Sequence, residues 1–296
     1  MNHRTDAKQL HERAEALRAL LSPCRLCPNK CNAYRIEGEL GRCGVGSKPQ
    51  IASYGPHFGE ERPLVGHLGS GTVFFSGCNV ACVHCQNWEI SQQREGHDLA
   101  ITDLATVFLS LQSTGCHNLN LVTPTHQAHA IAAALAIAAE SGFCLPVVWN
   151  CGGYESIEAL RVLDGIVDVY MPDLKYGDDA TAQRLSGVDN YVAISQAAVH
   201  EMHRQVGNLV LDERGIAMRG LLVRHLVLPQ DLAGTEAVVR FLADEISVDT
   251  YVNLMDQYRP AYRALEFPDL AQPITQDEFA RAKAIATRFG LHRFAR

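Results

Sequence analysis

The chain has 296 residues, a length that suits either two domains of about 150 residues each or one α/β barrel. Its content of 47% hydrophobic and 20% charged residues excludes a disordered chain, and its net charge of −7 argues against a large nucleic-acid-binding surface. No apolar run approaches the ~18 residues of a membrane helix, and the polar N-terminal sequence does not resemble a secretory signal. We therefore expect a cytoplasmic protein without a membrane partner.

Cysteine is the residue type that departs most from an ordinary composition, with ten in the chain. Clustered cysteines without an export signal indicate metal binding or chemistry rather than a disulfide framework. The first cluster is Cys24, Cys27, Cys31 and Cys43. The second is Cys78, Cys82 and Cys85. Three more lie in apolar sequence, where we expect small buried side chains: Cys116, Cys144 and Cys151.

The pattern of apolar residues changes along the chain. Leucine and alanine spacing predicts a short amphipathic helix over 6–21, whereas 22–70 show little periodicity and would need a metal to order them. Strands are then predicted over 72–76, 118–122, 145–149, 166–171, 221–228 and 250–254. Helices are predicted over 99–113, 127–140, 154–163, 178–185, 192–205, 234–245 and 276–289. Thr102 is the expected N-cap of the first of these, and 208–219 suggest a hairpin.

Strands that alternate with helices imply right-handed βαβ units and a parallel sheet. The six predicted strands fit either a doubly wound sheet or an incomplete barrel, and periodicity does not separate the two. In both architectures ligands bind at the carboxyl ends of the strands, where polar or reactive loops follow all six. We divide the chain into an N-terminal helix with a four-cysteine metal-binding segment (1–70) and an α/β unit (71–296).

The second cysteine cluster has the spacing C-x3-C-x2-C. A structural zinc site wants four ligands, and His84 is crowded by the cysteines on either side of it. A four-iron cluster uses three cysteines and leaves one iron open for another ligand. An open iron is where chemistry takes place.

This motif, placed after a buried strand at the start of a β/α series, resembles the radical S-adenosylmethionine superfamily. The resemblance implies a partial (β/α)6 barrel and a [4Fe-4S] cluster on Cys78, Cys82 and Cys85. It also implies reductive cleavage of S-adenosylmethionine to a 5′-deoxyadenosyl radical that abstracts hydrogen from a substrate, with the cofactors supplying the radical chemistry. A flavodoxin or ferredoxin would supply the electron. His84 stands where the superfamily usually has an aromatic residue.

Further segments resemble an orphan branch of the pyruvate formate-lyase activating-enzyme-like proteins. They are residues 24–28 with Arg35, Gly41 and Cys43, and residues 77–87, 121–126, 168–175, 224–229 and 255–260. Two features differ from true activating enzymes: residues 123–125 replace a Gly-Gly-Glu-type loop, and no cysteine lies between 85 and 116. A glycyl residue of a partner enzyme is therefore one possible substrate, and another protein or a small molecule is the alternative.

Several side chains are candidates for binding the cofactor or the substrate. Asp173 and Lys175 share one face of a strand, and the resemblance places such a pair beside S-adenosylmethionine, the alternative being a surface ion pair. Thr123 and Asn150 are further cofactor-binding candidates, although Asn150 also suits a tight turn. The substrate-side candidates are His126, Arg224 and Gln257. His225 should face away from Arg224.

The first cysteine cluster supplies four ligands, which close a tetrahedral zinc site or a second iron–sulfur cluster. Such a centre either stabilises the fold of the segment or transfers electrons. A hypothesis of a different class is a non-catalytic, zinc-stabilised binding module in which every cysteine is structural. The missing fourth ligand of the C-x3-C-x2-C loop favours the enzyme.

Overall fold

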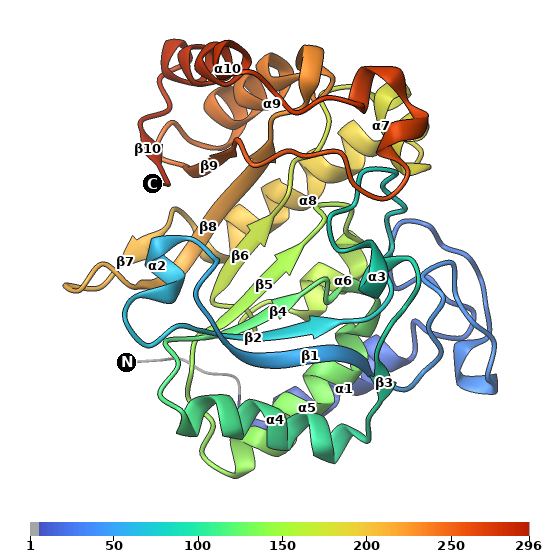
Figure 1. The fold of residues 1–296 in the computed structure, drawn as a ribbon. Coiled ribbons are helices and arrows are strands. Elements are labelled where there is room, and N and C mark those ends of the chain that lie inside the picture. Colours follow the sequence, from blue (N-terminus) through green and yellow to red (C-terminus); the bar gives the residue numbers. More distant parts are fainter. Residues whose placement is uncertain (1–5, 296) are drawn as a thin grey trace.

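The structure is a computed structural model that describes residues 6–295, and it contains one ten-stranded sheet (Figure 1). Six strands run parallel and lie in sequence order across its centre. They are β2 (Ser70–Phe75), β4 (Leu119–Val122), β5 (Val147–Cys151), β6 (Val169–Pro172), β8 (Ala217–Leu226) and β9 (Tyr251–Met255). A doubly wound sheet would reverse its order at a switch point. The sequential order instead gives the predicted partial (β/α)6 barrel.

Shorter strands extend the sheet at both edges. β10 (Arg293–Phe294) adds to β9 in parallel, and β7 (Val210–Leu211) forms the predicted hairpin with β8. At the other edge β1 (Gln50–His57) pairs antiparallel with β2, and β3 (His97–Asp98) pairs with β1. Because β1 lies within 22–70, the predicted boundary at residue 70 is not a boundary of the sheet.

The prediction that 22–70 lack regular structure was wrong for β1 and for α2 (Arg62–Val65). β1 is an edge strand whose only buried residue is Ile51, so its sequence carries no alternation of apolar and polar residues. Thr102 is not an N-cap, because its helix begins at Ile101 with Ala100 in the cap position. Cys116 and Cys151 are buried as predicted, but Cys144 is exposed in the turn before β5.

Helices follow the central strands and cover one face of the sheet, here called the outer face (Figure 1). They are α4 (Ile101–Ser113), α5 (Ala128–Glu140), α6 (Ile157–Val162), α8 (Tyr191–Val206), α9 (Thr235–Phe241) and α10 (Gln276–Arg288). α7 (Asp179–Ser186) instead packs against the second cysteine cluster. The N-terminal helix α1 (Ala7–Arg18) packs on α5. α3 (Trp88–Ser91) follows the second cysteine cluster. Within residues 6–295 no helix has the length and hydropathy of a membrane span.

Short helical turns complete the connections: η1 (Arg35–Glu37), η2 (Thr125–Gln127), η3 (Pro229–Asp231), η4 (Leu242–Ile246), η5 (Ala264–Glu266) and η6 (Pro268–Leu270). The expected helix over 234–245 is α9 followed by η4, which is a turn of π-helix.

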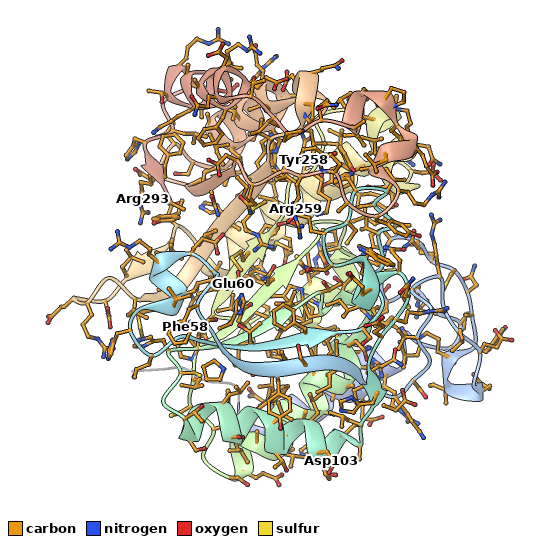
Figure 2. The ribbon with its side chains drawn as sticks, viewed as in Figure 1. Phe58, Glu60, Asp103, Tyr258, Arg259 and Arg293 are labelled. Atoms are coloured by element: carbon orange, nitrogen blue, oxygen red, sulfur yellow. The ribbon has the colours of Figure 1, made fainter. Side chains whose placement is uncertain are left out.

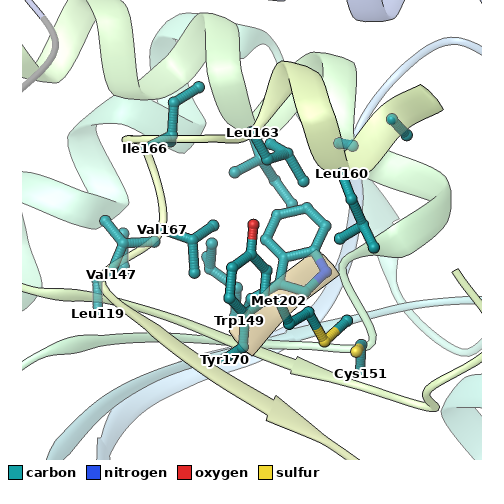
Figure 3. Close-up of a cluster of buried hydrophobic side chains, with 14 of the residues drawn as sticks. Leu119, Val147, Trp149, Cys151, Leu160, Leu163, Ile166, Val167, Tyr170 and Met202 are labelled. Carbon is teal, nitrogen blue, oxygen red and sulfur yellow. The ribbon is translucent and has the colours of Figure 1, made fainter. Parts of the chain in front are cut away.

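The two faces of the sheet differ in chemistry because successive side chains of a strand point to opposite faces. On the outer face Trp149 and Tyr170 pack with Met202 of α8 (Figure 3). On the opposite, inner face, the next residues along the same strands include Asn150 and Met171. The inner face therefore combines the polar side chain of Asn150 with an apolar group that includes Val148 and Met171 and packs with Leu64 of α2.

Candidate functional site

The second cysteine cluster lies in the loop that leaves the carboxyl end of β2, as predicted. The loop turns at Gly77, whose φ of +81° favours glycine. A side chain there would also meet the Cys43 carbonyl oxygen, since an ideal Cβ would lie 2.7 Å from it. The loop is thus packed directly against the first cysteine cluster.

Each thiol of this loop has a polar neighbour. The Val80 amide donates to Cys78 Sγ over 3.4 Å, and the Ser186 hydroxyl donates to Cys82 Sγ over 3.1 Å. The Cys85 Sγ and Ser91 Oγ atoms are 3.2 Å apart. Hydrogen bonds to sulfur are among the features that tune iron–sulfur clusters.

The three thiols also affect one another electrostatically. Burial raises the pKa of Cys78 and of Cys85, and the neighbouring Cys82 raises both further. Lys175 opposes this increase at both cysteines and so lies near the loop. One buried thiol (Cys82) and two half-buried ones (Cys78 and Cys85), with a nearby cation, form a donor set that suits a [4Fe-4S] cluster with one iron unligated by protein. Within residues 6–295 no three Cys, His, Asp or Glu side chains are arranged as a site for a single metal ion.

Beside the loop lies a charged network on the inner face of the sheet. Asp173 accepts from Lys175 Nζ over 2.7 Å and from Arg224 Nε over 2.8 Å. Arg224 Nη2 also donates to Asn150 Oδ1 over 2.7 Å. Burial would raise the pKa of Asp173, but Arg224 and Lys175 outweigh it and lower that pKa to about 2. Asp173 and Lys175 are only 16% and 22% exposed, so the pair is not the surface ion pair considered as the alternative.

Thr123 adjoins this network through its backbone. Its amide donates to the Asn150 carbonyl over 2.8 Å, and its φ is +58°. A β-branched residue rarely adopts this left-handed conformation, and such strain is concentrated at functional sites. The structure therefore brings together all four predicted cofactor-binding residues: Thr123, Asn150, Asp173 and Lys175.

The substrate-side candidates separate in the structure. Arg224 belongs to the charged network, and the backbone carbonyl of Gln257 accepts from Gln86 Nε2 over 3.1 Å beside the cysteine loop. His126 lies elsewhere: it is 1% exposed, and its Nε2 is 2.7 Å from the Ser76 carbonyl. Its proposed contact with substrate is corrected to a structural role beneath the loop. The sequence placed it in a polar loop but could not show that its ring turns inward.

His84 and His225 are both packed. Burial and Lys175 lower the pKa of His84 to about 3, and its ring contacts Tyr176 and Tyr258 edge-on. It is thus a neutral ring in an aromatic pocket. His225 is fully buried on the outer face, where Nδ1 meets the Leu174 carbonyl at 2.6 Å, as its position beside Arg224 predicted.

Sequence reasoning missed two acids that reach the inner face from the loop after β1. Glu60, which lies over the sheet in Figure 2, has its Oε2 3.3 Å from Arg224 Nη1. Glu61 accepts from Asn253 Nδ2 over 2.8 Å, and its other carboxylate oxygen is buried without a hydrogen-bond partner. The only available signal was a Glu-Glu pair in a segment without periodicity.

A third missed acid is Glu155, which joins the loops after β4 and β5. It is 3% exposed and accepts a hydrogen bond from the Thr125 hydroxyl. Burial raises the pKa of this carboxyl to about 7, although the hydrogen bond from Thr125 opposes the shift. Glu155 therefore supports the loop that contains Thr123.

The first cysteine cluster surrounds a glycine and a buried arginine. An ideal Cβ on Gly41 would lie 3.3 Å from Cys43 Sγ and 3.5 Å from both Cys31 Sγ and Arg35 Cδ. Cys24 and Cys27 are buried. Besides burial, the charges of Cys43 and Cys24 raise the pKa of Cys27, and that of Cys24 also raises the pKa of Cys43. All four predicted ligands are thus gathered in one place.

Comparisons with known proteins bear on the cysteine loop and on the fold. A family model described as a 4Fe-4S single cluster domain matches residues 66–188, which include the three-cysteine loop but not the four-cysteine segment. The maturase HydG of the [FeFe]-hydrogenase has a similar fold, with 14% identity and a TM-score of 0.50 over 72% of this chain. A radical SAM methyltransferase from Sphaerobacter thermophilus gives 17% identity and a TM-score of 0.48 over 76% of this chain. The chain matches 66% of the methyltransferase chain and 48% of the HydG chain.

The fold is therefore a partial (β/α)6 barrel similar to that of HydG, with a cysteine-rich N-terminal region. Among curated proteins, uncharacterized protein MJ0674 of Methanocaldococcus jannaschii is 32% identical over 289 residues, covering 94% of this chain and 78% of that protein. The chain belongs to the same family as MJ0674. Uncharacterized protein MJ0808 of the same organism is 25% identical over 286 residues, covering 88% and 77%.

Proposed function

We propose that the protein is a radical S-adenosylmethionine enzyme whose [4Fe-4S] cluster is bound by Cys78, Cys82 and Cys85. The observation that carries the proposal is a three-thiol loop, one ligand short, beside a charged network at the carboxyl edge of a parallel sheet. The bound cluster and S-adenosylmethionine together supply a 5′-deoxyadenosyl radical for hydrogen abstraction.

The residues of this chain bind and orient the cofactor. The Lys175 ammonium is free to attract the carboxylate of S-adenosylmethionine as a point charge, while Asp173 holds that ammonium in place. Arg224 fixes Asp173 and Asn150 together, so that these side chains need not reorganise when the cofactor binds. Thr123 supplies a hydroxyl on the adjoining loop. The edge-on rings around His84 exclude water from the base of the site.

The substrate class follows from resemblance alone. The segments similar to activating enzymes support a glycyl residue of a partner enzyme as the substrate, and another protein or a small molecule is the alternative. The electron donor is a flavodoxin or ferredoxin, and the setting is the cytoplasm. The four-cysteine segment is a second metal centre, holding either zinc or an auxiliary iron–sulfur cluster.

The proposal is tested by anaerobic reconstitution with iron and sulfide, followed by dithionite and S-adenosylmethionine. Chromatography should detect 5′-deoxyadenosine from the wild type but not from the Cys78→Ala/Cys82→Ala/Cys85→Ala variant. Cys144→Ser is the matched control, because Cys144 is exposed and outside both clusters. Product from the triple variant, or none from wild type with a full iron–sulfide complement and several reductants, would reject the proposal.

A further inference from the structure

Arg35 is a buried cation without a carboxylate partner. Only 1% of its surface is exposed, and a guanidinium stays protonated in a protein. Its Nε and Nη2 atoms donate to the Gly46 carbonyl over 3.1 and 2.6 Å, and Nη2 also donates to the His126 carbonyl over 2.9 Å. Within residues 6–295 no ion pair includes it. These carbonyl groups satisfy its hydrogen bonds but do not neutralise its charge.

The imidazoles around Arg35 do not compensate the charge either. Burial is the main cause that lowers the pKa of His126 to about 3 and that of His129 to about 4, and the charge of Arg35 contributes to both shifts. Both rings are therefore neutral near pH 7. A buried charge is normally paired, so Arg35 favours negative charge on the groups that surround it.

Thiols are the groups that face Arg35 and can become anionic. Arg35 Nη1 is 3.8 Å from Cys24 Sγ. The Arg35 Cδ, Cys31 Sγ and Cys43 Sγ atoms all lie within 3.5 Å of the point that a Cβ on Gly41 would occupy. The hollow that glycine leaves there is bordered by two sulfurs and the arginine. A side chain at residue 41 would occupy it.

We infer that Cys24, Cys27, Cys31 and Cys43 bind their metal as a tetrathiolate of net negative charge, for which Arg35 is the built-in buried counter-ion. Because no three such side chains in residues 6–295 are arranged for a single ion, a four-iron cluster is the group that suits this set of thiols, and four thiolates around an oxidised cluster leave a net charge of about −2. The inference rests on the second metal centre proposed above, and it does not depend on the radical reaction.

The centre adjoins the radical loop. Asn29 Nδ2 donates to the Asn79 carbonyl over 2.6 Å and lies 3.7 Å from Cys27 Sγ. Cys43 and Cys78 line one small pocket together with Asn79. An unneutralised dianion would therefore repel a second anionic cluster, and Arg35 reduces that repulsion.

The test uses the Cys78→Ala/Cys82→Ala/Cys85→Ala protein, so that any bound metal belongs to the four-cysteine segment. Anaerobically isolated protein should hold about four irons with matching sulfide per chain. Additional Cys24→Ala/Cys43→Ala substitutions should remove the iron. Folded protein without stoichiometric metal would overturn the inference, whether or not wild type cleaves S-adenosylmethionine.

The counter-ion is tested in the same background by the rate of metal release to a chelator. Arg35→Gln retains donors for the carbonyl groups but not the charge, and we expect release about tenfold faster, because attraction between close buried charges is weakly screened. Arg35→Lys should stay within about threefold of the parent protein. Arg25→Gln is the matched control, since Arg25 is exposed in the same segment beside Glu158.

Equal release from the Arg35→Gln and Arg25→Gln proteins would overturn the role of Arg35. Circular dichroism of the loaded proteins distinguishes metal loss from unfolding. Should Arg35→Gln not fold, Gly41→Ala gives an independent measurement: the added methyl group presses on two sulfurs and should also accelerate release. Unchanged release from Gly41→Ala would contradict the inferred metal position.

Discussion

The two cysteine clusters lie side by side but differ in how they are completed. The three-cysteine loop depends on the barrel, because the charge of Lys175 from the chain after β6 acts to lower the pKa of Cys78 and Ser186 of α7 donates a hydrogen bond to Cys82 Sγ. The four-cysteine segment is self-contained, with four thiols and a buried cation from within some twenty residues. Three cysteines at the carboxyl ends of the strands would leave one iron without a protein ligand, and that iron would be available for chemistry. Four cysteines would supply every protein ligand, so that a centre held by them would have no open position.

The largest effect is expected from removing one ligand of the three-cysteine loop, here called the open site because the protein supplies only three ligands. Cys82→Ala should abolish formation of 5′-deoxyadenosine, because two thiols do not hold a four-iron cluster, while the barrel stays folded. Product analysis with iron counting measures the loss. Retained cleavage by a Cys82→Ala protein would mean that the cluster lies elsewhere.

Removing a ligand from the four-cysteine segment, here called the closed site, should lower the stability of the protein. Cys43→Ala should lower the free energy of unfolding by about 3–5 kcal/mol through loss of the metal, and so lower Tm by roughly 10 °C. Limited proteolysis should then cut within 22–49 before it cuts the barrel. Cys144→Ser provides the comparison, and an equal Tm for the two variants would contradict a metal at Cys43.

The open site also depends on Glu155, whose effect should vary with pH. Its carboxyl has a pKa of about 7 when folded and an ordinary value of 4.5, so the folded state binds the extra proton between these values. Stability from this group is therefore lost as pH rises from about 4.5 to 7, by up to about 3 kcal/mol.

Glu155→Gln keeps a hydrogen-bond acceptor for Thr125 and removes the titration. Denaturant unfolding at several pH values should show that the free energy of unfolding of the variant rises relative to that of wild type as pH increases over that interval. A constant difference between the two proteins would show that Glu155 keeps its ordinary pKa.

A smaller effect tests the cation at the open site. Lys175→Met should weaken binding of S-adenosylmethionine to the reconstituted protein by about 10–100-fold, the value of one hydrogen bond to a charged group. Equilibrium binding under anaerobic conditions measures this. The Lys283→Met variant, changed on the exposed surface of α10, should bind S-adenosylmethionine with the affinity of wild type. Equal affinity of the two variants would show that Lys175 does not contribute to binding S-adenosylmethionine.

The sequence predicted the six central strands and both cysteine clusters because each has a local signature. A buried parallel strand is a continuous apolar run, and a metal loop is a fixed spacing. The strand bounds shifted by up to four residues: β5 runs on through Asn150 and Cys151, and β8 begins at Ala217, four residues before its predicted start.

What escaped prediction depends on contacts between distant segments. The sequence around β1 shows no alternation because the strand lies at an edge, and Glu60 reaches Arg224 only because α2 folds the chain across the inner face. His126 and Thr123 are three residues apart, yet one ring is buried beneath the loop and the other residue faces the network. Side-chain direction at such loops is set by tertiary packing.

The pairing of β1 with β2 has a consequence for anyone who shortens this protein. A chain that began at residue 71 would lose the strand that occupies the outer hydrogen-bonding edge of β2. That edge would then present free amide and carbonyl groups from an apolar strand, which is a template for intermolecular pairing. The N-terminal region thus covers a strand edge that would otherwise be open to pairing with another molecule, and this effect does not depend on what the four cysteines bind.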